Sequence, residues 1–319
     1  MRNVVDRGLV WLTEEKHSLY GAAVTRAIVG FVVCTQLLIN WTDRRYTWGD
    51  GAAWTDSIQQ GRSWPWFAHG IDALGGTWFD VAYVLTILAG AAMMLGWHSR
   101  AATVATLLLW VSLYVSNPFV GSGGDAVLRM TLLYLCFIET GRHFSLDRRI
   151  GTKVPRISLP SWFGTTLHNA ALVLVVHQVV VVYVASAFWK LQGDRWTDGT
   201  AVYYPLSTRA YSPWGDVIDP LVGWSPLIAV ASWSAVLIQL FFPVFLLYRP
   251  TRFLALIAVT MMHVGIGVLM GIMYFSLAMI AVDMILVSDR SWRQALFWCR
   301  RKGLCRILKV PSDYVRHPT

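Results

Sequence analysis

Apolar stretches of about 17 to 22 residues recur along the chain, each bounded by charged residues, glycine or proline. A helix needs roughly 20 apolar residues to cross the hydrocarbon core of a bilayer. Strands of a membrane barrel would instead alternate between apolar and polar residues, a pattern that these stretches lack. The chain is 55% hydrophobic and only 14% charged. These features predict an all-α integral membrane protein.

We expect a bundle of about eight transmembrane helices. The predicted spans are Tyr20 to Ile39, Phe79 to Gly96, Ala101 to Pro118, Ala126 to Glu139, His168 to Trp189, Leu227 to Tyr248, and two that share Phe253 to Val287 with a break near Gly271. The expected domains are an N-terminal segment (1–19), a membrane domain (20–288) and a basic tail (289–319). The first apolar run lacks a small-residue cleavage site, so we expect it to remain as an uncleaved helix.

The distribution of lysine and arginine predicts the orientation, because cytoplasmic loops are enriched in these residues. With the N-terminus inside, the inner segments hold most of the 27 lysines and arginines. We therefore expect both termini in the cytoplasm and the protein in a bacterial cytoplasmic membrane. The net charge of +9 is then a topology signal, with the tail contacting anionic membrane lipid, and no nucleic-acid partner is expected.

Two long segments are expected on the outer side, Asn40 to Thr77 and Leu191 to Ser225, with a shorter one at Asn117 to Asp125. Their many tryptophans are typical of the aromatic belt at a lipid interface. Loops of this length usually fold over something. We expect these outer loops to cap a cavity at the outer leaflet.

The four cysteines do not form a disulfide framework. Cys34 and Cys136 fall in predicted helices, and Cys299 and Cys305 fall in the inner tail, where thiols stay reduced. The last two lack accompanying histidines, so we expect no structural metal.

Six ionisable side chains fall within or beside the predicted spans; they are Arg26, Asp125, Arg129, His177, Lys190 and His263. Charged groups are costly in a membrane and are often functional. Asp125 and Arg129 are four residues apart, however, and a structural ion pair on one helix face explains them equally well. For His177 a buried, neutral ring satisfied by Gln178 or a neighbouring helix is the better interpretation. His263 favours a site role, because it has to meet a polar partner in an otherwise apolar helix.

Lys190 ends the fifth span and precedes a polar turn that contains Trp196. An amine in a desolvated pocket can be neutral near pH 7 and act as a base. On position alone, a lysine that snorkels to the lipid interface is the better explanation.

Several segments resemble the transmembrane domain shared by vitamin K-dependent gamma-carboxylase and the bacterial HTTM proteins. The matching segments are GGDAVLRMTLLYLCF, GRHFSLDRR, HQVVVVYVASAFWKLQGDRWTDGTAVYY and MHVGIGVLMGIMYFSLAMI. Within this group the chain is most similar to the sporulation-delaying protein B family, through LYGAAVTRAIVG, MLGWHSRAATVATLLLWVS and GGDAVLRMTLLYL. The resemblance covers about residues 19 to 288, and WKLQGDRW is its most specific part.

The resemblance implies a chemistry for these residues. Lys190 falls on the carboxylase lysine taken to deprotonate the reduced vitamin, so the implied cofactor is a reduced quinone, menaquinone or vitamin K hydroquinone. Asp125 falls about where the carboxylase has a functional histidine, a departure that puts identical chemistry in doubt, and His263 matches a histidine on a later helix. These three are the candidate catalytic residues. The candidate cofactor-binding residues are Arg129, His177, Trp196, Tyr203 and Tyr274.

The resemblance also implies a biological role. Nothing after Asp283 could form the large lumenal domain of the carboxylase, so we do not expect a full carboxylase. In the sporulation-delaying family a toxin precursor is matured by the membrane protein together with a small partner. The implied function is therefore maturation or export of a secreted, toxin-like peptide precursor, with an SdpA-like partner protein. Two alternatives stay open: a non-enzymatic peptide-binding, immunity or scaffold protein, and a quinone-dependent carboxylase or oxygenase with other substrates. A transporter is disfavoured because the chain has no apparent inverted repeat.

Overall fold

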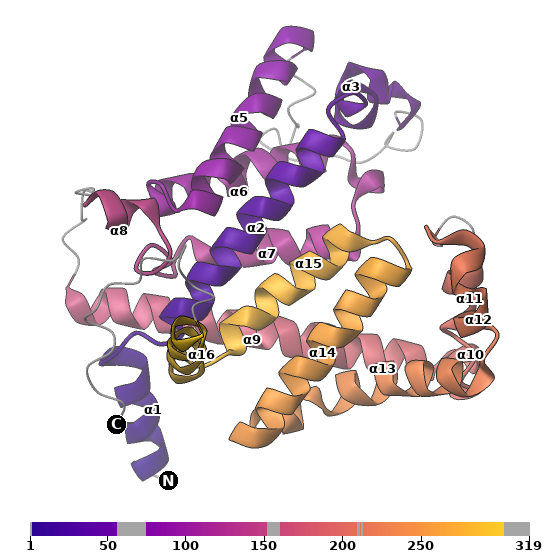
Figure 1. Cartoon of the computed structure of the whole chain (residues 1–319). Helices are drawn as coiled ribbons and strands as arrows, with labels where there is room; N and C mark the ends of the chain where they lie inside the picture. Colours follow the sequence, from indigo (N-terminus) through magenta and orange to yellow (C-terminus); the bar gives the residue numbers. More distant parts are fainter. Residues whose placement is uncertain (1, 56–74, 152–159, 209–210, 212, 303–319) are drawn as a thin grey trace.

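The computed structural model describes residues 2–55, 75–151, 160–208, 211 and 213–302, and these residues form helices and connecting turns without a strand. Eight apolar helices build the bundle (Figure 1); they are α2 (Leu19–Ile39), α5 (Gly76–Leu95), α6 (Ser99–Ser116), α7 (Gly123–Leu135), α9 (Ser161–Leu191), α13 (Ser225–Leu246), α14 (Arg249–Leu269) and α15 (Met273–Asp283). All except α7 and α15 are long and apolar enough to cross a membrane. The prediction of an all-α, multi-pass membrane protein is confirmed.

Two of the eight predicted spans are shorter than expected. α7 has 13 residues and α15 has 11, too few to cross about 30 Å of hydrocarbon at 1.5 Å per residue. Both lie inside the bundle, where α15 packs on α2, α7 and α14, and α7 also packs on α6 and α9. Helix ends surrounded by protein do not need to reach the membrane surface. The predicted break at Gly271 is confirmed, because this residue adopts a φ of +71° between α14 and α15.

Arg26 in α2 has a structural role. Its fully buried guanidinium donates hydrogen bonds to the carbonyls of Met93 and Met94 at the end of α5. It also donates to the carbonyls of Thr140, at 3.3 Å, and Phe144, at 2.7 Å, in the segment after α7. Four carbonyls from two segments thus surround one cation, which ties α2 to both and leaves Arg26 outside the candidate site.

Short helices gather at the two ends of the bundle. On the side of the bundle where α9 begins lie α1 (Arg2–Thr13), α8 (Leu146–Ile150) and α16 (Asp289–Arg301). At the far end of α9 and α13 lie α10 (Asp194–Thr197), α11 (Tyr203–Ser207) and α12 (Asp219–Val222), as Figure 1 shows. A single-turn helix, η6 (Gly215–Ile218), precedes α12.

The segment between α9 and α13 folds back onto the bundle, as expected of an outer loop. A small hydrophobic cluster joins this segment to α13, and its members are Leu206, Ile218, Val222 and, from α13, Ile228. The indole nitrogen of Trp214 donates to the carbonyl of Val268 on α14, at 2.7 Å. This segment therefore covers the ends of α13 and α14.

The other long segment expected on the outer side is described only in part. α3 (Arg44–Trp48) and the single-turn helix η1 (Asp50–Thr55) follow α2, whereas 56–74 lie outside the described residues. Arg44 and Arg45 both pair with Asp80 on α5, at 2.8 and 2.5 Å. Of the cysteines, Cys34, Cys136 and Cys299 are free thiols, and Cys305 lies outside the described residues.

Candidate functional site

The amine of Lys190 is turned into the bundle at the end of α9. Its Nζ donates to Oγ of Ser186, one turn earlier, and to Oε1 of Gln239 on α13, at 2.7 Å. The ring of Trp196, from α10, lies 5.2 Å from the same nitrogen. A snorkelling lysine would point its head to water, whereas this one is half-buried and held by side chains from α9, α10 and α13.

All of these partners of Lys190 are uncharged. The ion pairs found in the described part of the chain join other residues, and none includes Lys190. Burial of a charge without an opposite charge is costly. A hydroxyl and an amide oxygen accept hydrogen bonds from an ammonium or from a neutral amine, so this setting suits both forms.

Gln239 lies in α13 one turn before a proline. Pro243 lies inside this helix, four residues later. Proline has no N–H, so it cannot donate the usual helical hydrogen bond to the carbonyl of Gln239, and its ring disturbs the helix there. The amide of Gln239 is buried, and its Nε2 lies 3.9 Å from the sulfur of Met262 on α14. The residue that holds Lys190 thus sits where three helices meet and where one of them lacks a backbone hydrogen bond.

A second polar cluster lies deeper in the same helices. The hydroxyl of Tyr183 on α9 donates to Oδ2 of Asp283 on α15, at 2.7 Å, and lies 3.1 Å from Nε2 of His263 on α14. All three side chains are at most 1% exposed. The rings of Phe242 and Phe275 pack against the cluster from α13 and α15. His263 therefore has the polar partner that was expected from its position in an otherwise apolar helix.

The two clusters are close neighbours along α9. Tyr183 and Lys190 are seven residues apart, which is two turns, or about 10 Å of helix rise. Met262, which contacts Gln239, directly precedes His263 in α14. The structure thus brings two of the predicted site residues, Lys190 and Trp196, into contact and places a third, His263, in the neighbouring cluster.

Asp125 has a different setting. Its Oδ2 accepts hydrogen bonds from the backbone N–H of Ser122, at 2.6 Å, and from the Ser122 hydroxyl, at 2.8 Å, which closes a capping box at the start of α7. Its other oxygen lies 3.4 Å from Nε2 of Gln36 on α2. These contacts give Asp125 a structural role as a helix cap, and no hydrogen bond among the described residues joins it to the Lys190 cluster.

The ion pair between Asp125 and Arg129, one of the two interpretations that the sequence left open, is not found among the described residues. Arg129 places its guanidinium 3.9 Å from the ring centre of Tyr114 on α6, and the ion pairs of the described residues do not include Asp125. A cation over an aromatic face is an alternative way to stabilise an intramembrane arginine. The reason is geometric, because the capping box points the carboxylate back to Ser122 and away from the next turn.

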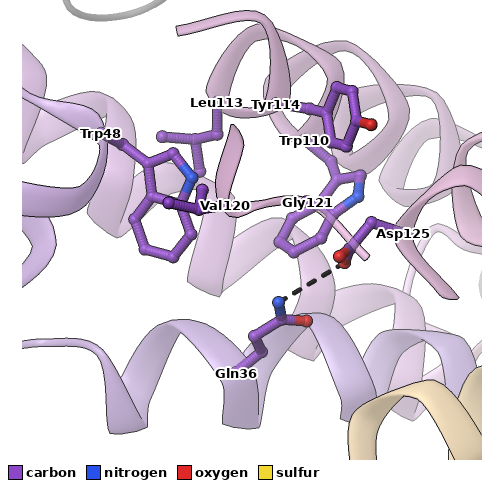
Figure 2. A pocket seen from close by; sticks show the side chains of 8 residues that line it. All are labelled: Gln36, Trp48, Trp110, Leu113, Tyr114, Val120, Gly121 and Asp125. Carbon is purple, nitrogen blue, oxygen red and sulfur yellow. Dashed lines mark hydrogen bonds between the residues drawn. The ribbon is translucent and has the colours of Figure 1, made fainter. Parts of the chain in front are cut away.

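Figure 2 shows a small cavity beside Asp125, between α2, α6 and the segment before α7. Its volume is about 10 Å³, room for one water molecule and far too little for a quinone ring. The indole N–H of Trp110 and Oε1 of Gln36 are buried there without partners. These atoms and the Asp125 carboxylate suit a bridging water.

Three of the predicted cofactor-binding residues lie away from Lys190 or make other contacts. His177 is exposed on α9, so the expectation that it is a buried, satisfied histidine is wrong; its position in the helix turns it to the outside of the bundle. Tyr203 is 45% exposed and packs edge-on against Tyr204 on the outer segment. Tyr274 is half-buried against the hydrophobic core, next to Phe275.

Comparison with known proteins identifies the family of the chain. Residues 16–292 match the HTTM domain, which is most of the chain. The chain belongs to the HTTM domain family. No solved structure matches this HTTM protein.

Two relatives from Bacillus subtilis (strain 168) show what this HTTM protein is similar to. The uncharacterized protein YitO is 26% identical over 194 residues, which is 60% of this chain and 61% of YitO. The chain thus matches less than two thirds of the length of YitO. The sporulation-delaying protein SdpB is 22% identical over 284 residues, which is 87% of this chain and 84% of SdpB. The similarity to SdpB extends over most of both chains.

The sequence did not single out four residues of the HTTM protein that complete these clusters, namely Tyr183, Ser186, Gln239 and Asp283. Each was visible in principle, because a polar group inside an apolar span has to find a partner. Gln239 is the one amide in α13, and Asp283 is the one charged residue in α15. Which partner each finds depends on helix packing.

Proposed function

We propose that this protein is a membrane factor in the maturation or export of a secreted, toxin-like peptide, in which Lys190 acts as a base on a reduced quinone. The observation that carries the proposal is the setting of Lys190, a half-buried amine whose hydrogen-bond partners are a hydroxyl and an amide. Burial without an opposite charge disfavours the ammonium and makes a neutral amine available as a proton acceptor. The similarity to SdpB supports the peptide pathway.

The residues around Lys190 fit a lipid-soluble, hydroxyl-bearing ligand. Phe188 and Trp189 are 54% and 73% exposed on the turn that precedes Lys190, so a ligand that diffuses in the bilayer meets apolar rings there. Trp196 offers a flat aromatic face on the other side of the amine. When bound, a reduced quinone would supply an acidic hydroxyl and reducing power. Ser186 and Gln239 would hold the amine in position to take up the proton.

The orientation that we propose places Lys190 on the outer side and both termini in the cytoplasm. α1 and α16 lie together at the end of the bundle opposite to α10, α11 and α12 (Figure 1). If the first and last described helices lie on the same side, the chain crosses the membrane an even number of times. The basic residues near both of these helices favour the cytoplasm for that side. A secreted peptide and a small SdpA-like partner would then meet Lys190 outside.

The test is maturation of a co-expressed precursor peptide, followed by mass spectrometry of the secreted product. We expect Lys190→Ala and Lys190→Arg both to abolish the product at unchanged membrane levels, because a guanidinium stays protonated and cannot act as a base. Lys302→Ala, directly after α16, removes a lysine that lies over the ring of Trp298 and serves as the matched control. Full activity of Lys190→Arg would contradict the base role and favour a peptide-binding or scaffold protein.

A further inference from the structure

The cluster of Tyr183, His263 and Asp283 has the composition of a proton path. The tyrosine hydroxyl lies between a carboxyl oxygen, at 2.7 Å, and a ring nitrogen, at 3.1 Å, and it has a single proton to donate. If it donates to Asp283, it accepts from an Nε2–H of His263. If it donates to His263, it accepts from a protonated Asp283. The same three positions therefore suit two proton arrangements.

Both ends of this chain of hydrogen bonds are open. Oδ1 of Asp283 and Nδ1 of His263 are fully buried and have no hydrogen-bond partner among the residues that the structure describes. The hydroxyl oxygen of Ser276, which faces Gly267 on α14, is also buried without one. Buried polar groups in purely structural networks are nearly all satisfied, because each orphan costs free energy. Unsatisfied atoms at both ends favour a path that a proton or a water enters and leaves.

The charges around the cluster are few. The ion pairs of the described residues include neither His263 nor Asp283. The hydroxyl of Thr25 on α2 donates its proton to the carbonyl of Ala281. It therefore has no proton to donate to the carboxyl of Asp283. An ionised carboxylate that is wholly buried in a membrane and lacks a cation is strongly disfavoured.

We propose that His263, Tyr183 and Asp283 form a proton wire that begins beside Lys190 and in which Asp283 holds a proton at neutral pH. This inference rests on the proposed function, which supplies the proton that Lys190 takes up. A proton that reaches Nδ1 of His263 forms a new N–H bond there, and the Nε2–H bond breaks as its proton passes to the Tyr183 oxygen. The original Tyr183 proton passes to Oδ2 of Asp283, and the proton that Asp283 held on Oδ1 is released at that open end. One proton enters at His263 and one leaves at Asp283, and all three side chains end neutral.

The direct test is infrared spectroscopy of the purified protein in lipid nanodiscs. Ordinary aspartates and glutamates ionise near pH 4, so at pH 7 a carbonyl-stretch band of a protonated carboxylic acid would mark an unusual group. We expect this band in the wild type and its loss in Asp283→Asn. It should persist in Asp125→Asn, the matched control, which removes another buried membrane aspartate that has its own partners. Absence of the band, or its survival in Asp283→Asn, would overturn the proposal.

A second variant keeps the test decisive if Asp283→Asn does not fold. Tyr183→Phe keeps the ring between Phe242 and His263 but removes the central hydroxyl. We expect the carboxylic-acid band to shift, because the acid loses its hydrogen-bond partner, and Lys190-dependent maturation to slow by at least about tenfold. An unshifted band would show that Tyr183 does not contact the protonated group.

The two proposals fail in different ways. If Lys190→Arg is fully active but the band depends on Asp283, the base role fails and the protonated carboxyl stands. If Lys190 is essential but no band is present, the proton wire fails and the base role stands. If Tyr183→Phe shifts the band without slowing maturation, the cluster is a structural network and the wire is refuted.

Discussion

Nζ of Lys190, in the last turn of α9, donates a hydrogen bond of 2.7 Å to the side-chain oxygen of Gln239, in the middle of α13. This contact is the link between the end of one membrane helix and the interior of another. It distinguishes Lys190 from a lysine that merely ends a helix, and it provides a way to change the charge of the amine without changing the lysine.

Gln239→Glu should separate a neutral base from a fixed cation. The two side chains have nearly the same shape, but the glutamate would form an ion pair with Lys190 and stabilise the ammonium. We expect maturation to fall at least about tenfold, while thermal stability is unchanged or higher. Gln239→Leu, which adds no charge, should reduce activity less. Wild-type maturation in Gln239→Glu would mean that Lys190 works as a cation.

Pro243→Ala should straighten α13 at the turn that carries Gln239. The new N–H can donate to the Gln239 carbonyl, a gain of about 1 kcal/mol in the free energy of unfolding. We expect a higher midpoint of thermal unfolding together with reduced maturation, because Gln239 would be drawn away from Lys190. The matched control is Pro226→Ala at the start of the same helix, where proline is normally tolerated. We expect this variant to keep its activity.

Arg26→Met should destabilise the fold without touching the Lys190 cluster. It would remove hydrogen bonds to four carbonyls, at about 1 kcal/mol for each bond, although the carbonyl of Met93 would keep the N–H of Gly96 as a partner. We expect low membrane levels and a much lower midpoint of thermal unfolding. Arg26→Lys should restore the stability only in part, because an ammonium has three donors for these four carbonyls. Normal stability of Arg26→Met would show that these bonds contribute little.

Stability should decline in mild acid because of His143, in the segment between α7 and α8. Burial lowers the pKa of His143 to about 4, and its ring stacks on Tyr20. An unfolded histidine binds its proton near pH 6.5, so the folded state binds fewer protons between about pH 6.5 and 4. The free energy of unfolding should therefore be greatest above about pH 6.5 and fall as the pH drops towards 4. Thermal unfolding of His143→Phe across this range should show a weaker pH dependence.

Reporter fusions should settle the orientation. Alkaline phosphatase is active only outside the cytoplasm, so a fusion after Gly199 should be active and one after Arg156 inactive. The first site follows α10 beside Lys190, and the second lies in the basic segment before α9. The reverse pattern would place Lys190 on the cytoplasmic side and exclude a role in processing a secreted peptide there.

The sequence by itself determined the class of fold. In lipid the backbone has to satisfy its own hydrogen bonds, so each long apolar run becomes a helix regardless of its neighbours. The break at Gly271 is equally local, because a positive φ favours glycine. The end of the fifth span at Lys190 followed from the change in composition at that point.

Only the tertiary structure decided the partners of each polar group. Lys190 and Gln239 are 49 residues apart, and Tyr183 is 80 residues from His263 and 100 from Asp283. Helix periodicity says which residues share a face of one helix, but not which face of another helix it meets. Packing also made α7 and α15 short and turned His177 outward. It gave Asp125 a capping role, because contacts between helices decide whether a membrane-embedded charge is structural or available for chemistry.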